Sequence, residues 1–203
     1  MKILNLYAGI GGNRKLWRDE HEIVAVELDP KIAAIYQELF PNDKVIVTDA
    51  HQYLLEHYKE FDFIWSSPPC PTHSTLQNLI RVQRPEYDKY PDMALYQEII
   101  YLKHWFKGKY CIENVISYYE PLVKPQELEN HYFWANFIIQ PLNTKSIREH
   151  HAPIDKLEER KGFNLEKYKG IDKRKALRNC VEPETGLHIL QCALGLNRQK
   201  PLL

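Results

Sequence analysis

Residues 2–12 read KILNLYAGIGG, a short apolar run that ends in a glycine-rich turn. An apolar run of this length is typical of a buried strand, and glycine allows the tight turn that leads from a strand into a helix. The free backbone N–H groups at such a helix start favour a negative group of a ligand. We therefore expect a ligand site at this turn, although close helix–strand packing would also require glycine there.

The rest of the first half alternates strand-like and helix-like segments. This order indicates an α/β fold, with a mostly parallel central sheet and helices on both faces. Ligands of such folds bind at the carboxyl ends of the strands. After a first strand at residues 2–7, further strands are predicted at residues 23–27, 45–48, 61–66, 110–115 and 132–137. Helices are predicted at residues 13–20, 30–40, 50–58, 93–107 and 183–194.

The bulk composition suits a single domain over residues 1–203, because 44% of the residues are hydrophobic. No run approaches the roughly 20 apolar residues of a spanning helix. The amino terminus becomes polar too early for a signal peptide, so we expect a cytoplasmic protein with no membrane partner. The four cysteines form no Cys-x-x-Cys pair, and we expect neither a metal site nor a disulfide framework.

Charge is unevenly distributed along a chain whose net charge is zero. Residues 145–178 hold 11 Lys and Arg against 6 Asp and Glu. A basic segment attracts phosphate even on a neutral protein. A solvated, lysine-rich surface would give the same pattern, so charge alone does not establish a nucleic-acid site.

Three features at successive strand ends indicate a cofactor that carries adenosine. The glycine turn follows the first predicted strand, Glu27 ends the second and Asp49 ends the third. A carboxylate in the position of Glu27 can accept both hydroxyls of a ribose. Asp49 can accept a hydrogen bond from an adenine amino group. Nicotinamide cofactors and S-adenosylmethionine both fit this pattern.

Cys70 follows Pro68-Pro69 at the end of the fourth predicted strand, and Glu113 lies at the end of the fifth. Prolines stiffen a loop because their φ is fixed. Methylation of cytosine at C5 needs a thiolate that attacks C6 and a carboxyl that gives a proton toward N3. Adjacent parallel strands would bring Cys70 and Glu113 to one base. Taken singly, Cys70 could be a small buried hydrophobe and Glu113 a surface ion-pair partner.

These residues resemble the motifs of the cytosine-C5 DNA methyltransferase family, over nearly the full chain. Residues 6–12 are similar to the family's first motif, Phe-Ala-Gly-x-Gly-Gly. Pro69-Cys70 and Glu113-Asn114-Val115 match its Pro-Cys and Glu-Asn-Val motifs. Residues 178–181, Arg-Asn-Cys-Val, resemble its last motif, Gly-Asn-Ser-Val, which contacts the cofactor beside the first motif.

The resemblance implies a Rossmann-like methyltransferase fold and S-adenosylmethionine as the cofactor. The implied catalytic residues are Cys70, Glu113 and Asn114. The implied cofactor-binding residues are Tyr7, Ala8, Gly9, Ile10, Gly11, Gly12, Glu27, Leu28, Asp49, Ala50, Pro69, Asn179 and Cys180. Ser74 matches the serine that ends the Pro-Cys motif. Together with basic side chains that would hold phosphates, it gives the expected nucleic-acid contacts, Ser74, Lys145, Arg148, Lys173, Arg174 and Lys175.

The chain departs from the family pattern at three places. Pro71 replaces the usual Gln after the cysteine, and His73 stands where an aromatic is common. In residues 125–130, which match the Gln-x-Arg-x-Arg motif by position, Leu128 and Asn130 replace the two arginines, one of which contacts the target base in the family. Arg148 is a candidate replacement. A basic insertion at residues 141–175 takes the place of a full target-recognition domain.

We expect methyl transfer to cytosine C5 in DNA, duplex or single-stranded, with the base flipped out of the stack. The family's habits suggest a restriction-modification role in a bacterial cell or a phage-infected host. The same chemistry on RNA or tRNA, or with a separate specificity subunit, is an alternative. An inactive cofactor-binding relic and a nicotinamide oxidoreductase are further alternatives. The recognition sequence cannot be read from residues 141–175.

Overall fold

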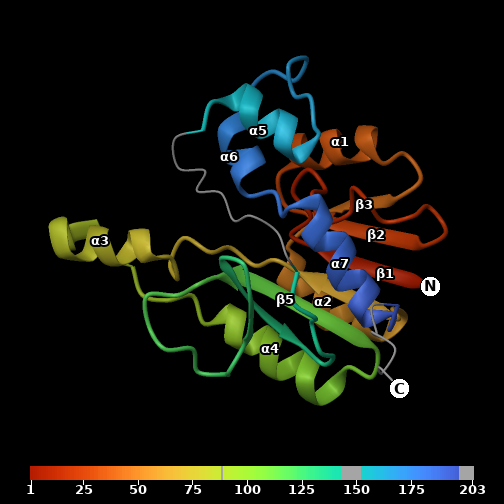
Figure 1. The fold of residues 1–203 in the computed structure, drawn as a ribbon, viewed down its shortest axis with the longest axis horizontal. Coiled ribbons are helices and arrows are strands. Elements are labelled where there is room, and N and C mark those ends of the chain that lie inside the picture. The colour runs from red at the N-terminus through yellow and green to blue at the C-terminus, as the bar shows by residue number, and fades with distance from the viewer. Residues whose placement is uncertain (88, 143–151, 197–203) are drawn as a thin grey trace, which may run out of the picture.

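A seven-stranded sheet crosses the centre of the molecule in the order β3-β2-β1-β4-β5-β7-β6 (Figure 1). The computed structural model describes residues 1–87, 89–142 and 152–196. The first five strands along the chain are parallel, whereas β7 runs antiparallel to both β5 and β6. The prediction of a mostly parallel sheet is confirmed. The strands are β1 (Lys2–Leu6), β2 (Glu22–Glu27), β3 (Lys44–Val47), β4 (Phe63–Ser66), β5 (Lys109–Val115), β6 (Gln126–Leu128) and β7 (His131–Ala135).

Helices cover both faces of this sheet. On one face, Leu54 and Ile99 from α2 and α4 pack with Leu4 of β1. On the other face, Ile189 of α7 packs with Ile3, and α1 lies against β2 and β3. The helices are α1 (Pro30–Leu39), α2 (Ala50–His57), α3 (Thr75–Gln83), α4 (Ala94–Trp105), α5 (Ile154–Lys161), α6 (Lys173–Arg178) and α7 (Pro183–Ala193), with short 3-10 turns at Tyr58–Glu60 and Pro85–Tyr87.

The helix predicted at residues 13–20 is wrong, because this stretch forms a series of turns. Its backbone hydrogen bonds span three residues, as in turns. Two neighbouring side chains are buried and fastened to other parts of the fold. Asn13 donates to Asn5 over 2.8 Å, and the Arg14 guanidinium donates to Asp43 over 2.9 Å. These buried polar bonds determine the local path in place of a helical ladder.

The basic segment contains helices that the sequence pattern did not predict. α5 and α6 lie in it, and Leu157 and Leu177 pack in one cluster with Ile35 of α1. In the described part of the basic segment, α5 and α6 therefore form a folded layer beside α1 (Figure 1). Residues 143–151 lie outside the described residues, and the assignment of residues 141–175 as a replacement for a recognition domain stays a prediction.

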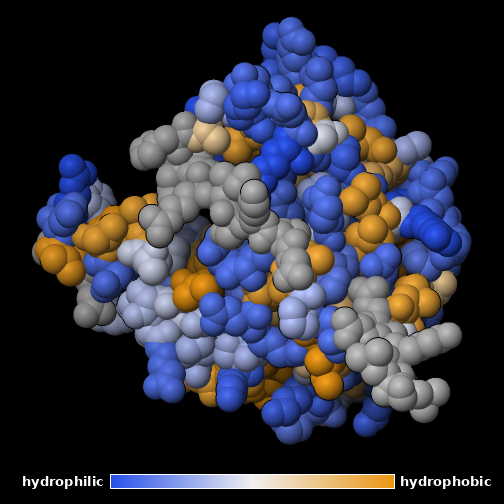
Figure 2. Space-filling view, in the orientation of Figure 1, coloured by the Kyte–Doolittle hydropathy of each residue, from blue (hydrophilic) through white to orange (hydrophobic). Residues whose placement is uncertain are grey.

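An unpredicted helix, α3, follows the Cys70 loop and extends away from the sheet (Figure 1). Its side chains at Leu76, Leu79 and Val82 are 56%, 55% and 75% exposed, and they form an apolar surface at the left of Figure 2. The helix has an amphipathic spacing in its sequence, but the apolar side does not face the sheet. Gln77 of this helix is buried and donates a hydrogen bond to the Tyr87 carbonyl.

Candidate active site

Glu27 fastens the glycine-rich turn after β1 to the end of β2. The Gly9 backbone N–H donates to its Oε2 over 2.9 Å, and the Asp29 backbone N–H donates to its Oε1 over 2.9 Å. Gly9 has a φ of +55°, and a Cβ built there would meet no atom within 4 Å. Each carboxylate oxygen keeps capacity for a second hydrogen bond. The turn therefore presents an open, polar edge at the carboxyl ends of β1 and β2.

Asp49 and Leu28 extend this edge along the sheet. Asp49 caps α2 by accepting a hydrogen bond of 2.8 Å from the Gln52 backbone N–H through Oδ1. Its side chain is exposed, and Ala50 behind it is buried. Leu28 is 66% exposed directly after Glu27, although large apolar side chains are usually covered. An apolar side chain beside two carboxylates suits a flat ring that carries polar groups.

The structure brings the first and the last predicted motifs together. A Cβ built on Gly12 would lie 2.2 Å from the Cys180 sulfur, so only glycine permits this close approach. Cys180 is buried, Asn179 is exposed next to it, and the Lys161 ammonium donates to the Cys180 carbonyl over 2.7 Å. Asn179 thus lies at the same edge as the glycine turn.

The other predicted cofactor residues differ in their surroundings. Ala8 and Gly11 are buried, and Ile10 packs inward among residues of α1, α5 and α6. Pro69 is exposed, and Tyr7 is half-buried. The turn is therefore open at Gly9, whereas the side chain of Ile10 points into the core.

Asn114 ties the loop that carries Cys70 to the end of β5. Its side-chain amide donates to the Pro68 carbonyl over 2.9 Å, and its own Oδ1 accepts from the Val115 backbone N–H over 3.0 Å. The Cys70 carbonyl in turn accepts backbone bonds from His73 and Ser74. Cys70 is therefore half-buried in a loop fixed at both sides.

Glu113 is 9% exposed near the end of β5, which pairs in parallel with the strand that leads into the Cys70 loop. Its Oε1 is 3.6 Å from Nε2 of His131 on the antiparallel strand β7. Burial raises the pKa of the Cys70 thiol, the Glu113 charge raises it further, and the Arg178 charge opposes both. The free thiol is thus protonated at neutral pH.

Two polar groups near this edge were missed by the sequence prediction. Glu98 of α4 is fully buried and accepts hydrogen bonds from Tyr7 and Ser66. His73 is 1% exposed, and its Nδ1 lies 2.6 Å from the Tyr119 hydroxyl. Glu98 sits within an apolar helical pattern, which gave no sign that a carboxylate would find donors on other elements.

The predicted nucleic-acid contacts are only partly available for phosphate. Lys173 donates to the Glu166 carbonyl over 3.0 Å, and Arg174 donates to the Ala152 carbonyl over 2.5 Å, so both hold the α5–α6 layer together. Lys175 is exposed, and the Ser74 hydroxyl faces the Pro71 carbonyl at 3.3 Å. Lys145 and Arg148 lie outside the described residues.

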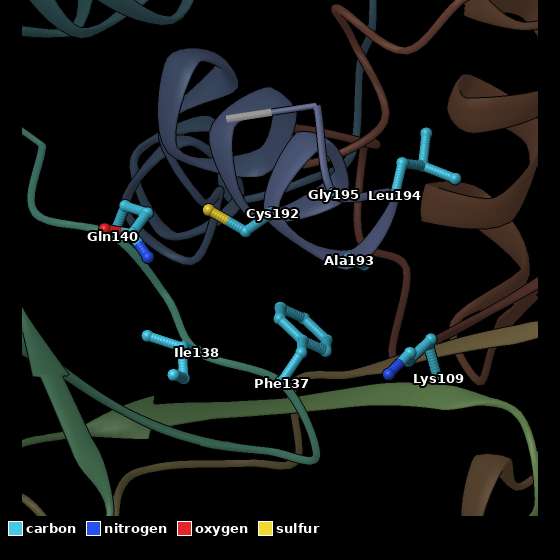
Figure 3. A pocket seen from close by; sticks show the side chains of 8 residues that line it. All are labelled: Lys109, Phe137, Ile138, Gln140, Cys192, Ala193, Leu194 and Gly195. Atoms are coloured by element: carbon cyan, nitrogen blue, oxygen red, sulfur yellow. The ribbon is translucent and has the colours of Figure 1, made fainter. Parts of the chain in front are cut away.

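A pocket of about 550 Å³ lies away from this site, between the end of α7 and the chain after β7 (Figure 3). The pocket adjoins Lys109, the first residue of β5, and so lies at the end of this strand opposite to Glu113. Its lining residues are Lys109, Phe137, Ile138, Gln140, Cys192, Ala193, Leu194 and Gly195. Within the described ranges, we find neither a helix able to span a membrane nor a cluster of metal-binding side chains.

The residues at the open edge fit the adenosine part of S-adenosylmethionine. Glu27 is oriented by two backbone N–H groups, Asp49 is exposed at the next strand end, and Leu28 next to Glu27 offers an exposed apolar surface. The open space at Gly9 admits a ligand to the backbone. The chemistry of this donor set therefore agrees with the group that the resemblance implies.

The sheet order and the site at its carboxyl edge define a methyltransferase fold. The chain is similar to the Entamoeba histolytica methyltransferase EhMeth over 98% of this chain and 99% of that one, with a TM-score of 0.58 and 10% identity. The chain belongs to the C-5 cytosine-specific DNA methylase family, whose sequence model matches residues 1–115. A Spodoptera frugiperda DNMT2 variant shares 25% identity over 56% of this chain and 35% of that one, with a TM-score of 0.39. The comparison with curated proteins gave no match.

The two arginine replacements lie in different environments. Leu128 is 7% exposed and packs in the core on the α7 face, so its side chain cannot reach a base. Asn130 is exposed in the turn between β6 and β7. In the described part of the chain, the basic group whose charge acts on Cys70 is instead Arg178, which replaces the glycine of the last motif.

Proposed function

We propose that the chain transfers the methyl group of S-adenosylmethionine to C5 of cytosine in DNA, through a covalent bond between Cys70 and C6. The observation that carries this proposal is the joint placement of Cys70 and Glu113. β4, which leads into the Cys70 loop, pairs in parallel with β5, which carries Glu113, and Asn114 next to Glu113 donates a hydrogen bond to the Pro68 carbonyl in that loop. Membership of the C-5 cytosine-specific DNA methylase family supports methyl transfer.

The proposed donor site is the open edge formed by the glycine turn. Glu27 accepts hydrogen bonds from the ribose hydroxyls, Asp49 accepts one from the adenine amino group, and Leu28 packs on the adenine ring. S-adenosylmethionine supplies an electrophilic methyl group when it is bound. Asn179, which lies beside the glycine turn, closes the site from the α6 side.

The side chains of Cys70 and Glu113 together provide a nucleophile and an acid. Moving one proton from the thiol to the carboxylate gives a thiolate and a carboxylic acid without changing the total charge. The loss of the Glu113 charge also removes one cause of the raised Cys70 pKa. One proton transfer therefore prepares both groups for the reaction.

The reaction then follows from the electron demands of cytosine. The thiolate adds to C6 while Glu113 gives its proton toward N3, which makes C5 nucleophilic. After C5 has taken the methyl group, a base removes the C5 proton. The electrons of that C–H bond restore the C5–C6 double bond, the thiolate leaves, and the proton on N3 returns to Glu113.

Arg178 is the proposed contact for the base oxygen in place of the missing arginines. It is exposed at the end of α6, and its positive charge reaches Cys70. A guanidinium there would serve two purposes, because it stabilises the thiolate and can donate to cytosine O2. Lys175 on the same helix is exposed and would hold phosphate.

The test is methyl transfer from labelled S-adenosylmethionine to duplex DNA, single-stranded DNA and tRNA in parallel. We expect label in cytosine of DNA, and none with Cys70→Ala. Cys192→Ala is the matched control, because Cys192 lies beside the remote pocket. Equal transfer by Cys70→Ala would overturn the proposal.

A covalent trap examines the mechanism separately from turnover. In 5-fluorocytosine the C5 position carries fluorine in place of the proton, so the final elimination is blocked and the protein stays joined to the DNA. We expect a shifted band on a denaturing gel for the wild-type protein and not for Cys70→Ala. Label on tRNA alone would move the substrate to RNA and leave the Cys70 chemistry standing.

A further inference from the structure

The carboxylate of Glu98 joins three elements beneath the proposed site. It is 0% exposed. The Tyr7 hydroxyl donates to Oε1 over 2.6 Å, the Ser66 hydroxyl donates to Oε2 over 2.7 Å, and Nδ1 of His51 lies 3.0 Å from Oε1. A carboxylate is stable in such a place only when donors of this kind surround it. Glu98 of α4 therefore links β1, β4 and α2 through a single charged group.

Two of these hydrogen-bond partners, Tyr7 and His51, belong to segments that shape the proposed S-adenosylmethionine site. Tyr7 begins the turn that leads to Gly9, and it has a φ of +55°, which a side chain other than glycine rarely adopts. Its hydroxyl bond to Glu98 helps to hold this backbone conformation. His51 lies in the first turn of α2, two positions after Asp49. The glycine-rich turn and the start of the helix that Asp49 caps are thus both fastened to the buried carboxylate of Glu98.

The third hydrogen-bond donor, Ser66, ends the strand that leads into the Cys70 loop. Ser66 is the last residue of β4, four positions before Cys70, and it is fully buried. Because the Glu98 carboxylate binds Tyr7, directly after β1, and Ser66, at the end of β4, a movement of the glycine-rich turn is coupled to a movement of the Cys70 loop.

We propose that Glu98 is a positioning residue that fixes the glycine-rich turn, Asp49 and the Cys70 loop relative to one another, and so sets the affinity for S-adenosylmethionine. The inference rests on the proposed function, because it presumes that this edge binds that donor. Glu98 itself is buried beneath the edge and acts through Tyr7, His51 and Ser66.

The His51–Glu98 pair gives the arrangement a characteristic pH dependence. Glu98 and Gln97 of α4 form hydrogen bonds with the His51 ring, and the charge of Asp49 at the start of α2 acts on it as well. The hydrogen bond to Glu98 raises the pKa of His51 above its ordinary value. The charged pair is therefore complete below that raised pKa and is lost as pH rises through it. Donor affinity should fall over the same range.

The test is calorimetric binding of S-adenosylmethionine from pH 6 to pH 9. We expect Glu98→Gln and His51→Asn to weaken binding by about tenfold, as for a lost hydrogen bond to a charged group. Both should also flatten the pH dependence. The matched controls are Glu60→Gln and His57→Asn, because His57 on the same helix pairs with Glu60 at 2.6 Å on the surface. Both control variants should bind S-adenosylmethionine with the affinity and the pH dependence of the wild-type protein.

Tyr7→Phe keeps the test decisive if Glu98→Gln does not fold. It removes one hydroxyl and should also raise KM for the donor more than it lowers kcat. Wild-type affinity and pH dependence in both Tyr7→Phe and His51→Asn would overturn the inference. Failure of the wild-type protein to bind S-adenosylmethionine would instead overturn the proposed function.

Discussion

The side-chain amide of Asn114 donates a hydrogen bond of 2.9 Å to the carbonyl oxygen of Pro68. This bond crosses from the end of β5 to the loop after β4, where it reaches the residue two positions before Cys70. The two strands pair in register, with Ser66 opposite Ile112, so the sheet brings the two segments together and the amide fixes the last part of the distance. The relative placement of the proposed nucleophile and acid depends on this contact.

Replacing Asn114 with Ala should slow methyl transfer by about tenfold to a hundredfold. The substitution leaves the Pro68 carbonyl without its hydrogen-bond donor, at a cost of about 1–3 kcal/mol. Single-turnover rates with labelled S-adenosylmethionine would measure the effect. Asn136→Ala is the control, since Asn136 donates a similar 2.8 Å bond to the Gly108 carbonyl at the other end of β5. Equal losses in both variants would contradict a specific role for Asn114.

The reactivity of Cys70 should rise steeply with pH. Burial and then the Glu113 charge raise the pKa of its thiol, so the thiolate forms only at alkaline pH in the free protein. Alkylation by iodoacetamide, followed by mass spectrometry from pH 6 to pH 10, would record the profile. Glu113→Gln should move the profile to lower pH, because it removes the neighbouring negative charge.

Arg178→Gln should move the same profile to higher pH, since the Arg178 charge opposes the rise in the Cys70 pKa. Lys175→Gln is the matched control, because Lys175 is an exposed basic residue on the same helix. A profile that is unchanged in Arg178→Gln, or shifted equally in Lys175→Gln, would argue against a direct effect of Arg178 on the thiol.

The sequence predicted the parts of the fold that depend on local pattern. Apolar runs indicated the five parallel strands and the strand at β7, and motifs at their ends indicated where a site would form. It failed where buried polar contacts between distant segments decide the structure. Arg14 is helical by propensity, yet its bond to Asp43 fixes a turn. Glu98 and His131 join the site only because separate elements bring their partners to them.

Gly12→Ala should destabilise the protein by about 1–3 kcal/mol through overpacking. The added carbon would lie 2.2 Å from the Cys180 sulfur and 2.4 Å from the Val181 carbonyl oxygen, so the last motif must move away from the first. Thermal unfolding and donor binding should both report the change. Gly9→Ala serves for comparison, because it introduces a strained φ but no clash, and its loss of stability should be smaller.

The buried pair of Arg14 and Asp43 should matter more for stability than its exposed counterpart. The Arg14 and Asp43 side chains are 3% and 2% exposed, whereas that of Asp19, which Arg14 also contacts, is 74% exposed. Asp43→Asn should therefore cost about 3 kcal/mol or more in the free energy of unfolding. Asp19→Asn should cost less than about 1 kcal/mol. Urea unfolding of both variants would measure the difference, and similar losses would contradict it.

Restoring the arginine that the family carries at position 128 should harm the protein. Leu128 packs in the core with Phe133 and Ile189, so Leu128→Arg would bury a charge without a partner and cost about 3–5 kcal/mol. Asn130→Arg changes an exposed side chain and should leave stability within about 0.5 kcal/mol. Thermal melts and labelled transfer by each variant would separate the two positions. A stable Leu128→Arg protein with faster transfer would show that this strand can reach the base, and would remove the need for Arg178.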